Sequence, residues 1–227
     1  MRLFAILFAV LPCGTLAEGI VATPYAEAVQ SLTSVVDFEN PPFQRKRFVE
    51  TQPLQEACAT FGEAFMGQRI RTVEIFGDSF DSIGGKPSSP LALAPPSMLW
   101  FLTREQLSHG RSVALLGNGP KGADKQAGVG EGAIAILFDI PQSAVAFTYD
   151  THSPDVKQRR GTMVLRFFDA EGRQLGFRRE RLGRRGDVAF GTQNSQFDIK
   201  GILITNIDPG GIAIDDVHMR CDTLPMS

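Results

Sequence analysis

Short apolar runs separated by turn residues dominate the second half of the chain. Residues 132–140 form an almost continuous apolar run, residues 144–149 alternate, and residues 162–168 and 174–178 flank an Asp-Ala-Glu-Gly turn. Continuous runs of this length are typical of buried strands, and alternation with a period of two is typical of strands with one buried face. The pattern therefore predicts a series of short strands in this region.

The stretch 201–217 gives the clearest of these signals. Two Ile-rich runs flank an Asp-Pro-Gly-Gly turn at 208–211, and the second run ends near two adjacent carboxylates, Asp215 and Asp216. β-Branched runs around such a turn predict a hairpin or a corner between two strands. We expect this stretch to close the sheet at its C-terminal end.

The first half of the chain carries weaker strand signals between longer polar segments. Strand candidates are residues 34–39, 58–65, 70–76, 98–102 and 112–116, and a short helix is expected at 25–32. Loops are expected at 77–97 and 117–130, and a loop or one helical turn at 43–57. Short strands at this spacing are typical of an all-β sandwich or jelly roll. We predict one β-sandwich domain over residues 33–222, with an extension at 18–32 and a tail at 223–227.

The N-terminal residues have the composition of a secretory signal. A basic start is followed by an apolar run at 3–11, which is shorter than the about 20 residues that a membrane helix needs. The small residues Thr15 and Ala17, at positions −3 and −1, predict cleavage after Ala17. Residues 1–17 are therefore expected to be a signal peptide, and the mature chain is expected to be secreted or periplasmic. Lipidation of Cys13 is the alternative, but Pro12 stands where a lipoprotein signal carries a small residue.

Removal of the signal leaves two cysteines, Cys58 and Cys221. Two thiols in an oxidising compartment favour one disulfide, which would join an early element to the C-terminal strand. The alternative is two separately buried thiols.

The charge of the chain is close to balanced, with 23 basic and 25 acidic residues and a formal net charge of −2. This balance gives no electrostatic reason to expect nucleic acid as a partner. The densest charged segment is an arginine cluster made of Arg178, Arg179, Arg181, Arg184 and Arg185. We interpret it as a solvated face, because Glu180 interrupts it, and a site for a polyanion is the alternative.

No residue pattern typical of nucleophilic or metal-dependent catalysis is present. His109, His152 and His218 belong to no His-Glu-x-x-His motif, and there is no Gly-x-Ser-x-Gly motif. The glycine-rich segment 128–132 precedes a strand and opens no helix, so it lacks the geometry of a phosphate loop. We therefore expect no enzymatic activity.

A hydrolase of envelope polysaccharide is the alternative class. Such an enzyme needs two carboxylates that face each other about 5–10 Å apart across a cleft. Asp78, Asp81, Asp150 and Asp155 are the candidates, and nothing in the sequence pairs them.

Acidic residues near the ends of the first and last predicted strands favour a cation site. Asp37 and Glu39 lie two positions apart and share a face of the first strand. If the first and last strands are neighbours, these carboxylates and those of Asp215 and Asp216 would form the oxygen shell that Ca²⁺ prefers. The alternative is that Glu39 and one Asp face solvent and the other Asp caps a turn.

Aromatic composition argues against a sugar-binding platform built from Trp and Tyr. Such platforms stack an exposed Trp or Tyr ring on the apolar side of a sugar. The chain has one Trp, Trp100, and two Tyr, Tyr25 and Tyr149, against 17 Phe, which is a composition typical of a core.

Four segments resemble a recurrent type of exported bacterial β-sandwich protein. They are residues 37–39 (Asp-Phe-Glu), 130–136 (Gly-Glu-Gly-Ala-Ile-Ala-Ile), 172–176 (Gly-Arg-Gln-Leu-Gly) and 201–217. Similar segments occur in galactose-binding-like jelly rolls of proteins that carry a PEP-CTERM sorting signal; a concanavalin-like jelly roll is the alternative within the fold class. The resemblance covers roughly residues 33–222 and implies a structural calcium held by Glu39 and by Asp215 or Asp216, with Asp37 as a further candidate. The last residues show no Pro-Glu-Pro and no apolar anchor, so we do not expect anchoring by that route.

These observations predict a secreted or periplasmic, non-catalytic β-sandwich that serves as a binding or cell-envelope module with a structural calcium. Its partner would be a glycan or another component of the cell envelope. A carbohydrate-binding domain is the alternative within binding proteins, and the polysaccharide hydrolase is the alternative among enzymes.

Overall fold

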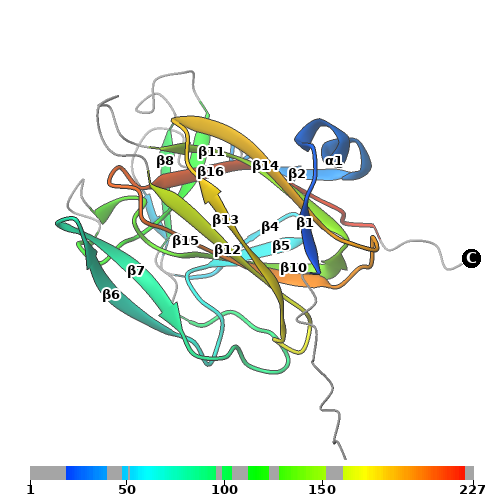
Figure 1. Ribbon diagram of the computed structural model, residues 1–227, viewed down its shortest axis with the longest axis horizontal. Helices are drawn as coiled ribbons and strands as arrows, with labels where there is room; N and C mark the ends of the chain where they lie inside the picture. Colours follow the sequence, from blue (N-terminus) through cyan, green and yellow to red (C-terminus); the bar gives the residue numbers. More distant parts are fainter. Residues whose placement is uncertain are drawn as a thin grey trace, which may run out of the picture.

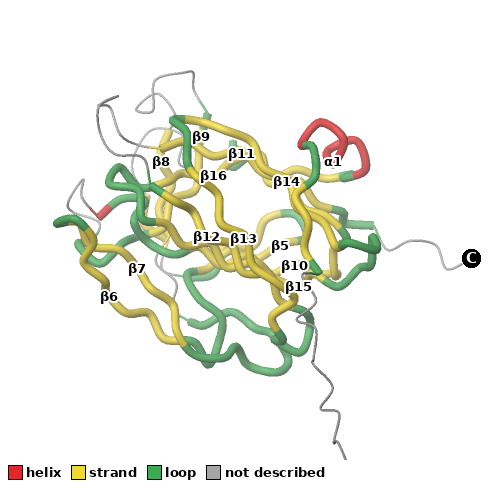
Figure 2. The backbone as a smooth tube through the Cα atoms, viewed as in Figure 1, coloured by secondary structure: helices red, strands yellow, loops and turns green. Residues whose placement is uncertain are grey.

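The computed structural model describes residues 19–39, 48–50, 52–95, 99–103, 112–122, 128–151 and 161–222. They form two large sheets and one separate hairpin, and all strand pairs are antiparallel. The predicted all-β sandwich is confirmed, whereas its jelly-roll connectivity stays a prediction. Figures 1 and 2 show that strands dominate, with the short helix α1 (Tyr25–Ser31) at one end of the molecule and the hairpin at the other.

The larger sheet has eight strands. They are β1 (Ile20–Ala22), β2 (Ser34–Val36), β3 (Phe48–Glu50), β8 (Leu99–Thr103), β9 (Val113–Gly117), β11 (Ala144–Thr151), β14 (Arg185–Thr192) and β16 (Ile212–Met219). Their order is β1-β14-β11-β16-β9-β8-β3, and β2 also pairs with β16. The sheet therefore includes residues from the segment before position 33, and the helix α1 (Tyr25–Ser31) packs Ala28 against Ala146 and Ala189.

The smaller sheet has six strands in the order β13-β12-β15-β10-β5-β4. They are β4 (Leu54–Glu56), β5 (Ala59–Gly62), β10 (Ile134–Gln142), β12 (Thr162–Phe168), β13 (Gln174–Arg181) and β15 (Ile199–Asn206). The predicted bounds 162–168 are those of β12, because the turn at 169–172 ends the strand as its sequence indicates. The strand β4 lies in the segment 43–57, so the prediction of a loop or a helical turn there was wrong. The segment carries no strand signal because apolar and polar residues do not alternate in it.

The main core lies between the two sheets and explains the high phenylalanine content. Phe61, Phe138, Phe147, Phe167 and Phe190 are all fully buried there. Phe167 of the smaller sheet meets Phe190 of the larger sheet edge to face, with ring centroids 5.4 Å apart. Burial of each such side chain stabilises the fold by about 1.5–3 kcal/mol.

A hairpin of β6 (Arg69–Ile75) and β7 (Asp78–Gly84) lies on the outer face of the smaller sheet. A second apolar cluster fixes it there, in which Ile83 joins Phe65, Phe168 and Leu203. The loop predicted for 77–97 was wrong at β7, whose sequence of Asp, Ser and Gly residues has low strand propensity. This strand forms because it pairs along its whole length with β6 and buries Phe80 and Ile83.

A disulfide joins Cys58 to Cys221, as the sequence predicts. Cys58 immediately precedes β5 of the smaller sheet, and Cys221 follows β16 of the larger sheet, so the bond ties the two layers together. Among the described residues, no helix has the length and apolar character needed to cross a membrane.

Candidate functional site

The first and last strands of the predicted domain are neighbours, because β2 pairs with β16. The four carboxylates proposed as cation ligands lie near this pair. Asp37 and Glu39 directly follow β2, and Asp215 and Asp216 lie within β16.

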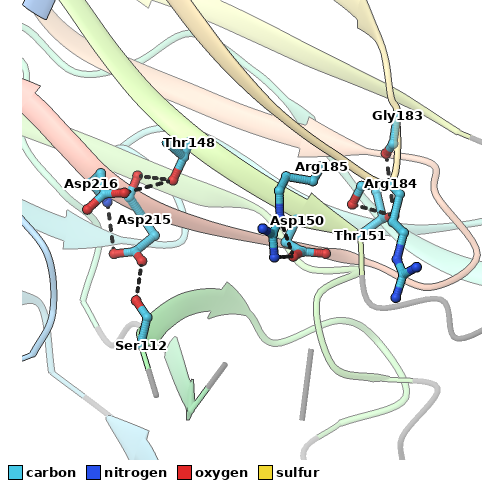
Figure 3. Close-up of polar contacts among 9 residues, drawn as sticks. All are labelled: Ser112, Thr148, Asp150, Thr151, Gly183, Arg184, Arg185, Asp215 and Asp216. Carbon is cyan, nitrogen blue, oxygen red and sulfur yellow. Dashed lines mark hydrogen bonds and ion pairs between the residues drawn. The ribbon is translucent and has the colours of Figure 1, made fainter. Parts of the chain in front are cut away.

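Asp215 is buried, and both of its carboxylate oxygens accept hydrogen bonds (Figure 3). Oδ2 accepts from the Ser112 hydroxyl at 2.7 Å, and Oδ1 accepts from the backbone N–H of Asp216 at 2.8 Å. Asp216 has a φ of 48° where the register between β16 and β11 shifts, which identifies a β-bulge. The Thr148 hydroxyl stabilises the bulge, since it lies 3.2 Å from the carbonyl oxygen of Asp215 and 3.3 Å from Oδ2 of Asp216.

Glu39 contacts the residue that follows Ser112. Its Oε1 accepts the N–H of Val113 at 2.9 Å, and Oδ1 of Asp37 accepts the N–H of Glu39 at 3.1 Å. Glu39 and Asp215 thus both hold the beginning of β9. Within the described part of the chain, no three His, Cys, Asp or Glu side chains gather as a metal ion would require. Calcium at these carboxylates stays a prediction.

Asp150, one of the acids considered for hydrolysis, forms an ion pair with an arginine. Its buried Oδ2 lies 3.3 Å from Nη2 of Arg185, which is its partner across the β11–β14 pair (Figure 3). This pairing gives Asp150 a role in holding two strands together. Asp155, His109 and His152 lie outside the described residues.

The tyrosines form no sugar platform. Tyr25 packs edge to face against His218, with ring centroids 5.9 Å apart, and burial lowers the pKa of this histidine. Tyr149 is buried, and its hydroxyl accepts the N–H of Gly183. The side chain of Trp100 lies outside what the structure describes.

A groove runs between the β6–β7 hairpin and the outer face of the smaller sheet. It consists of two cavities of about 380 and 520 Å³ that share Ile83 and Arg166, and we call them together the hairpin groove. The first cavity is lined by Val73, Ile75, Asp81, Thr162, Thr205 and Asn206, among others. The second is lined by Gln68, Lys86, Pro87, Phe168, Glu171 and Arg173, among others. Both volumes fall within the range of roughly 300–1,000 Å³ that is usual for ligand pockets.

The floor of the groove is set by the register of β12 against β13. Arg166 lies opposite Phe177, and Val164 lies opposite Arg179. Positions directly opposite each other, and positions two apart on one strand, share a face of a sheet. Arg166 and Arg179 both line the first cavity, so the outer face of this strand pair is the face that meets the groove.

The arginine cluster seen in the sequence is divided among three places. Arg178 donates a hydrogen bond to the carbonyl of Ile20, and Arg185 pairs with Asp150. Arg179 is exposed and lines the groove. The prediction of a purely solvated face was therefore incomplete, because alternate residues of β13 point to opposite faces of the sheet.

Asp81 is the acidic group of the first cavity. It is buried, and Oδ2 accepts the N–H of Ala133 at 3.0 Å while its own N–H donates to the carbonyl of Glu131 at 3.2 Å. Burial raises the pKa of Asp81 to about 6, against the opposing effect of the hydrogen bond from Ala133. Burial also raises the pKa of Glu131 to about 8.

Two exposed aromatic side chains come from the elements that form the groove. Phe177 on β13 is 60% exposed beside Arg166, and Phe76 in the turn of the hairpin is 75% exposed. The turn Phe76-Gly77 has positive φ at both residues, 54° and 92°, as a tight two-residue hairpin turn requires. Sequence reasoning missed Phe177, although its position between Gly176 and Arg178 in a polar strand is a signal of exposure.

No known family model matches the sequence, and comparison with curated proteins finds no match. Function must therefore be inferred from the groove and its chemistry.

Proposed function

We propose that this protein is an exported, non-catalytic binding module of the cell envelope, and that the hairpin groove binds an extended saccharide chain. The observation that carries the proposal is the groove itself. Two cavities of ligand size share Ile83 and Arg166 in their linings and follow β12 along the face of the smaller sheet. An extended ligand fits this shape better than a compact one.

The lining of the groove has the chemistry that saccharides need. Hydroxyl groups of a sugar both donate and accept, and the first cavity offers Asp81 and the hydroxyl groups of Thr162 and Thr205. Apolar faces of a sugar need apolar partners, and Phe177, which lines neither cavity, provides an exposed aromatic ring opposite Arg166 on the same face of the sheet. This supports the carbohydrate-binding alternative without the Trp and Tyr residues that the sequence made doubtful.

Export is the second part of the proposal. The disulfide supports location in an oxidising compartment, which is either the periplasm or the exterior of the cell. The signal predicted at residues 1–17 and the resemblance to exported galactose-binding-like proteins agree with it. The calcium expected at Glu39, Asp215, Asp216 and Asp37 belongs to the same proposal, and a lower melting temperature in EDTA is its test.

A polysaccharide hydrolase is the second candidate function. Asp81 favours it, since a carboxyl group with a pKa of about 6 in a cavity is suited to proton transfer. Hydrolysis needs a second carboxylate about 5–10 Å away across the cleft. Glu131 is the acid joined to Asp81 through the backbone, but it does not line either cavity. Binding therefore ranks before hydrolysis.

The test measures binding of soluble oligosaccharides to the mature protein by calorimetry and by affinity electrophoresis in polysaccharide gels. We expect Phe177→Ala to weaken binding about fivefold, because stacking on an aromatic ring contributes on the order of 1 kcal/mol. Phe197→Ala is the matched control, since Phe197 is 38% exposed and lies between β14 and β15, outside the β12–β13 pair that forms the floor of the groove. Equal loss in both variants, or no saccharide binding by the unmodified protein, would contradict the proposal. Release of reducing ends that stops in Asp81→Asn would favour the hydrolase instead.

A further inference from the structure

We infer that the saccharide held in the hairpin groove is anionic and carries carboxylate groups on its sugar residues. The inference rests on the proposed function and concerns the cationic side chains of the groove. Arg166 and Arg179 line the first cavity, and Lys86, Arg173 and again Arg166 line the second. Basic groups thus gather along one groove of a chain whose formal net charge is −2.

The pairing of these groups decides which of them is available to a ligand. Arg173 is already neutralised, because its Nε lies 2.6 Å from Asp169 and its Nη2 lies 3.3 Å from Glu171. Arg166 makes one side-chain hydrogen bond among the described residues, from Nη1 to the carbonyl of Ile83 at 3.3 Å. That bond orients the guanidinium group beneath the hairpin. Because a carbonyl oxygen is neutral, the positive charge of Arg166 has no acidic partner among the described residues.

Arg179 and Lys86 have no side-chain hydrogen bond or ion pair with any described residue. Both are exposed. Glu180, the acidic neighbour of Arg179 in β13, points to the opposite face of the strand because side chains alternate. Glu74 lies between Val73 and Ile75, which line the first cavity, so its side chain points to the other face of β6. The acids nearest in sequence therefore do not neutralise the groove floor.

The acids that do line the groove are accounted for. Glu171 is paired with Arg173, whereas Asp81 accepts the N–H of Ala133 and, above its pKa of about 6, offsets one of the two positive charges of the first cavity. The available cations are thus Arg166 and Arg179 in the first cavity and Lys86 in the second. They are distributed along the groove, as a ligand with repeated charges requires and a single small anion does not.

The geometry of the two arginines favours carboxylates as the repeated charge. Arg166 and Arg179 occupy diagonal positions on adjacent strands, since Arg166 faces Phe177 and Arg179 faces Val164. Diagonal positions in an antiparallel pair lie about 7–8 Å apart. The planar guanidinium group binds a carboxylate through two parallel hydrogen bonds, so the contact is directional as well as electrostatic. Phe177 lies directly opposite Arg166 and two residues from Arg179 on the same face, and offers its ring to the sugar that carries the acid.

The experiment compares three oligosaccharide probes with the mature protein: oligogalacturonate, its methyl ester of the same length, and a sulfated galactan oligosaccharide. We expect oligogalacturonate to bind at least about tenfold more tightly than the ester, because a charged hydrogen bond is stronger than a neutral one. Its affinity should fall with salt, whereas the affinity of the ester should not. Sulfated galactan should bind more weakly than oligogalacturonate, since a sulfate ester spreads its charge over three oxygens and each is a weaker hydrogen-bond acceptor than a carboxylate oxygen.

Variants of Arg179 separate the role of its guanidinium group from the effect of the protein's net charge. Arg179→Gln should reduce the preference for oligogalacturonate over its ester, and Arg179→Lys should restore only part of it, because a lysine keeps the charge and loses the fork. Arg184→Gln changes the net charge equally and lies outside both cavities, so it should leave the preference unchanged. Melting temperatures of all three variants should match that of the unmodified protein, since both positions are exposed.

The outcomes distinguish this inference from the proposed function. If the acid and its ester bind equally, or if sulfated galactan binds as tightly as oligogalacturonate, the inference is wrong while saccharide binding stands. An equal effect of Arg179→Gln and Arg184→Gln also overturns it, because the preference would then reflect net charge alone. If no saccharide binds, the inference and the proposed function both fail.

Discussion

Glu131 shows how the environment of one residue determines its charge. The residue is 3% exposed, and its Oε2 has no hydrogen-bond partner among the described residues. Burial is the main cause that raises its pKa from 4.5 to about 8, and the charges of Asp78 and Asp208 add to it. The backbone N–H of Glu131 and the charge of Lys121 act in the opposite direction. At neutral pH the carboxyl group is therefore mostly protonated in the folded protein.

The pKa of Glu131 predicts that the protein loses stability as pH rises from about 5 to 8. A carboxyl whose pKa is higher in the folded state contributes stability that is fully present below the unfolded pKa, 4.5, and is lost as pH rises through the folded pKa, about 8. Asp81 contributes in the same direction between 3.8 and about 6. We expect the free energy of unfolding to fall on the order of 3 kcal/mol across this window, measured by urea denaturation.

The variant Glu131→Gln identifies the group responsible. Glutamine keeps the shape and removes the titration, so the unfolding free energy should be nearly flat between pH 6 and 8 and should exceed that of the unmodified protein at pH 8. Glu171→Gln is the control, since that carboxylate is exposed and belongs to an exposed ion pair of small worth. A pH slope that persists in Glu131→Gln would contradict the assignment.

Individual groove residues could be predicted from the sequence only in part. The hairpin of residues 162–168 and 174–178 was predicted from its turn, and its register places Arg166, Phe177 and Arg179 on one face. The sequence did not reveal which face of the β12–β13 pair is covered by the β6–β7 hairpin. That depends on Ile83, which reaches the outer face of the smaller sheet from a strand with little apolar content.

At the scale of elements, the β6–β7 hairpin determines whether the groove exists. Its attachment uses three kinds of contact: the apolar packing of Ile83, the hydrogen bond from Arg166 to the carbonyl of Ile83, and the hydrogen bond from Ala133 to Asp81. Gly201 on β15 makes room for Phe65 and Leu91, which belong to the same apolar cluster as Ile83, since a Cβ there would lie 2.7 Å from the Phe65 ring and 2.8 Å from Leu91. Without this attachment, the outer face of β12 would be flat and solvated.

Removal of the Asp81 side chain should loosen the hairpin. Asp81→Ala leaves the buried N–H of Ala133 without an acceptor, which costs about 1–3 kcal/mol. We expect faster amide hydrogen exchange in β6 and β7, measured by mass spectrometry, with little change in β12 and β15. Asp81→Asn keeps an acceptor oxygen and should retain most of the protection. Unchanged exchange in Asp81→Ala would show that apolar packing alone holds the hairpin.

At the scale of the whole molecule, the sequence predicted the sandwich well because its strongest signals come from buried strands. The runs at 132–140, 162–168 and 212–219 correspond to β10, β12 and β16, which form the centre of the two sheets or lie next to it. The segment before residue 33 was expected to be an extension, yet β1 pairs with β14 of the larger sheet. A strand of three residues has too short a pattern to be recognised, and its position depends on an edge that only the folded sheet provides.

The disulfide between Cys58 and Cys221 connects the two sheets, and its removal should affect the stability of the entire domain. The bond closes a loop with a sequence separation of 163 residues, which greatly restricts the unfolded chain. The double variant Cys58→Ala/Cys221→Ala should unfold with a free energy about 2–5 kcal/mol lower, measured by urea denaturation under oxidising conditions. Reduction of the unmodified protein should produce a similar loss, because both treatments free the same loop.

Two measurements separate the crosslink from simple loss of packing. Cys58 is buried in the main core, so replacement by alanine also removes a small apolar contact. Comparison of the double variant with the reduced protein isolates that packing contribution, since the reduced protein keeps both side chains. Thiol titration of the denatured, unreduced mature protein should find no free thiol. Two free thiols, or equal unfolding free energies before and after reduction, would show that the sheets are held together by their core alone.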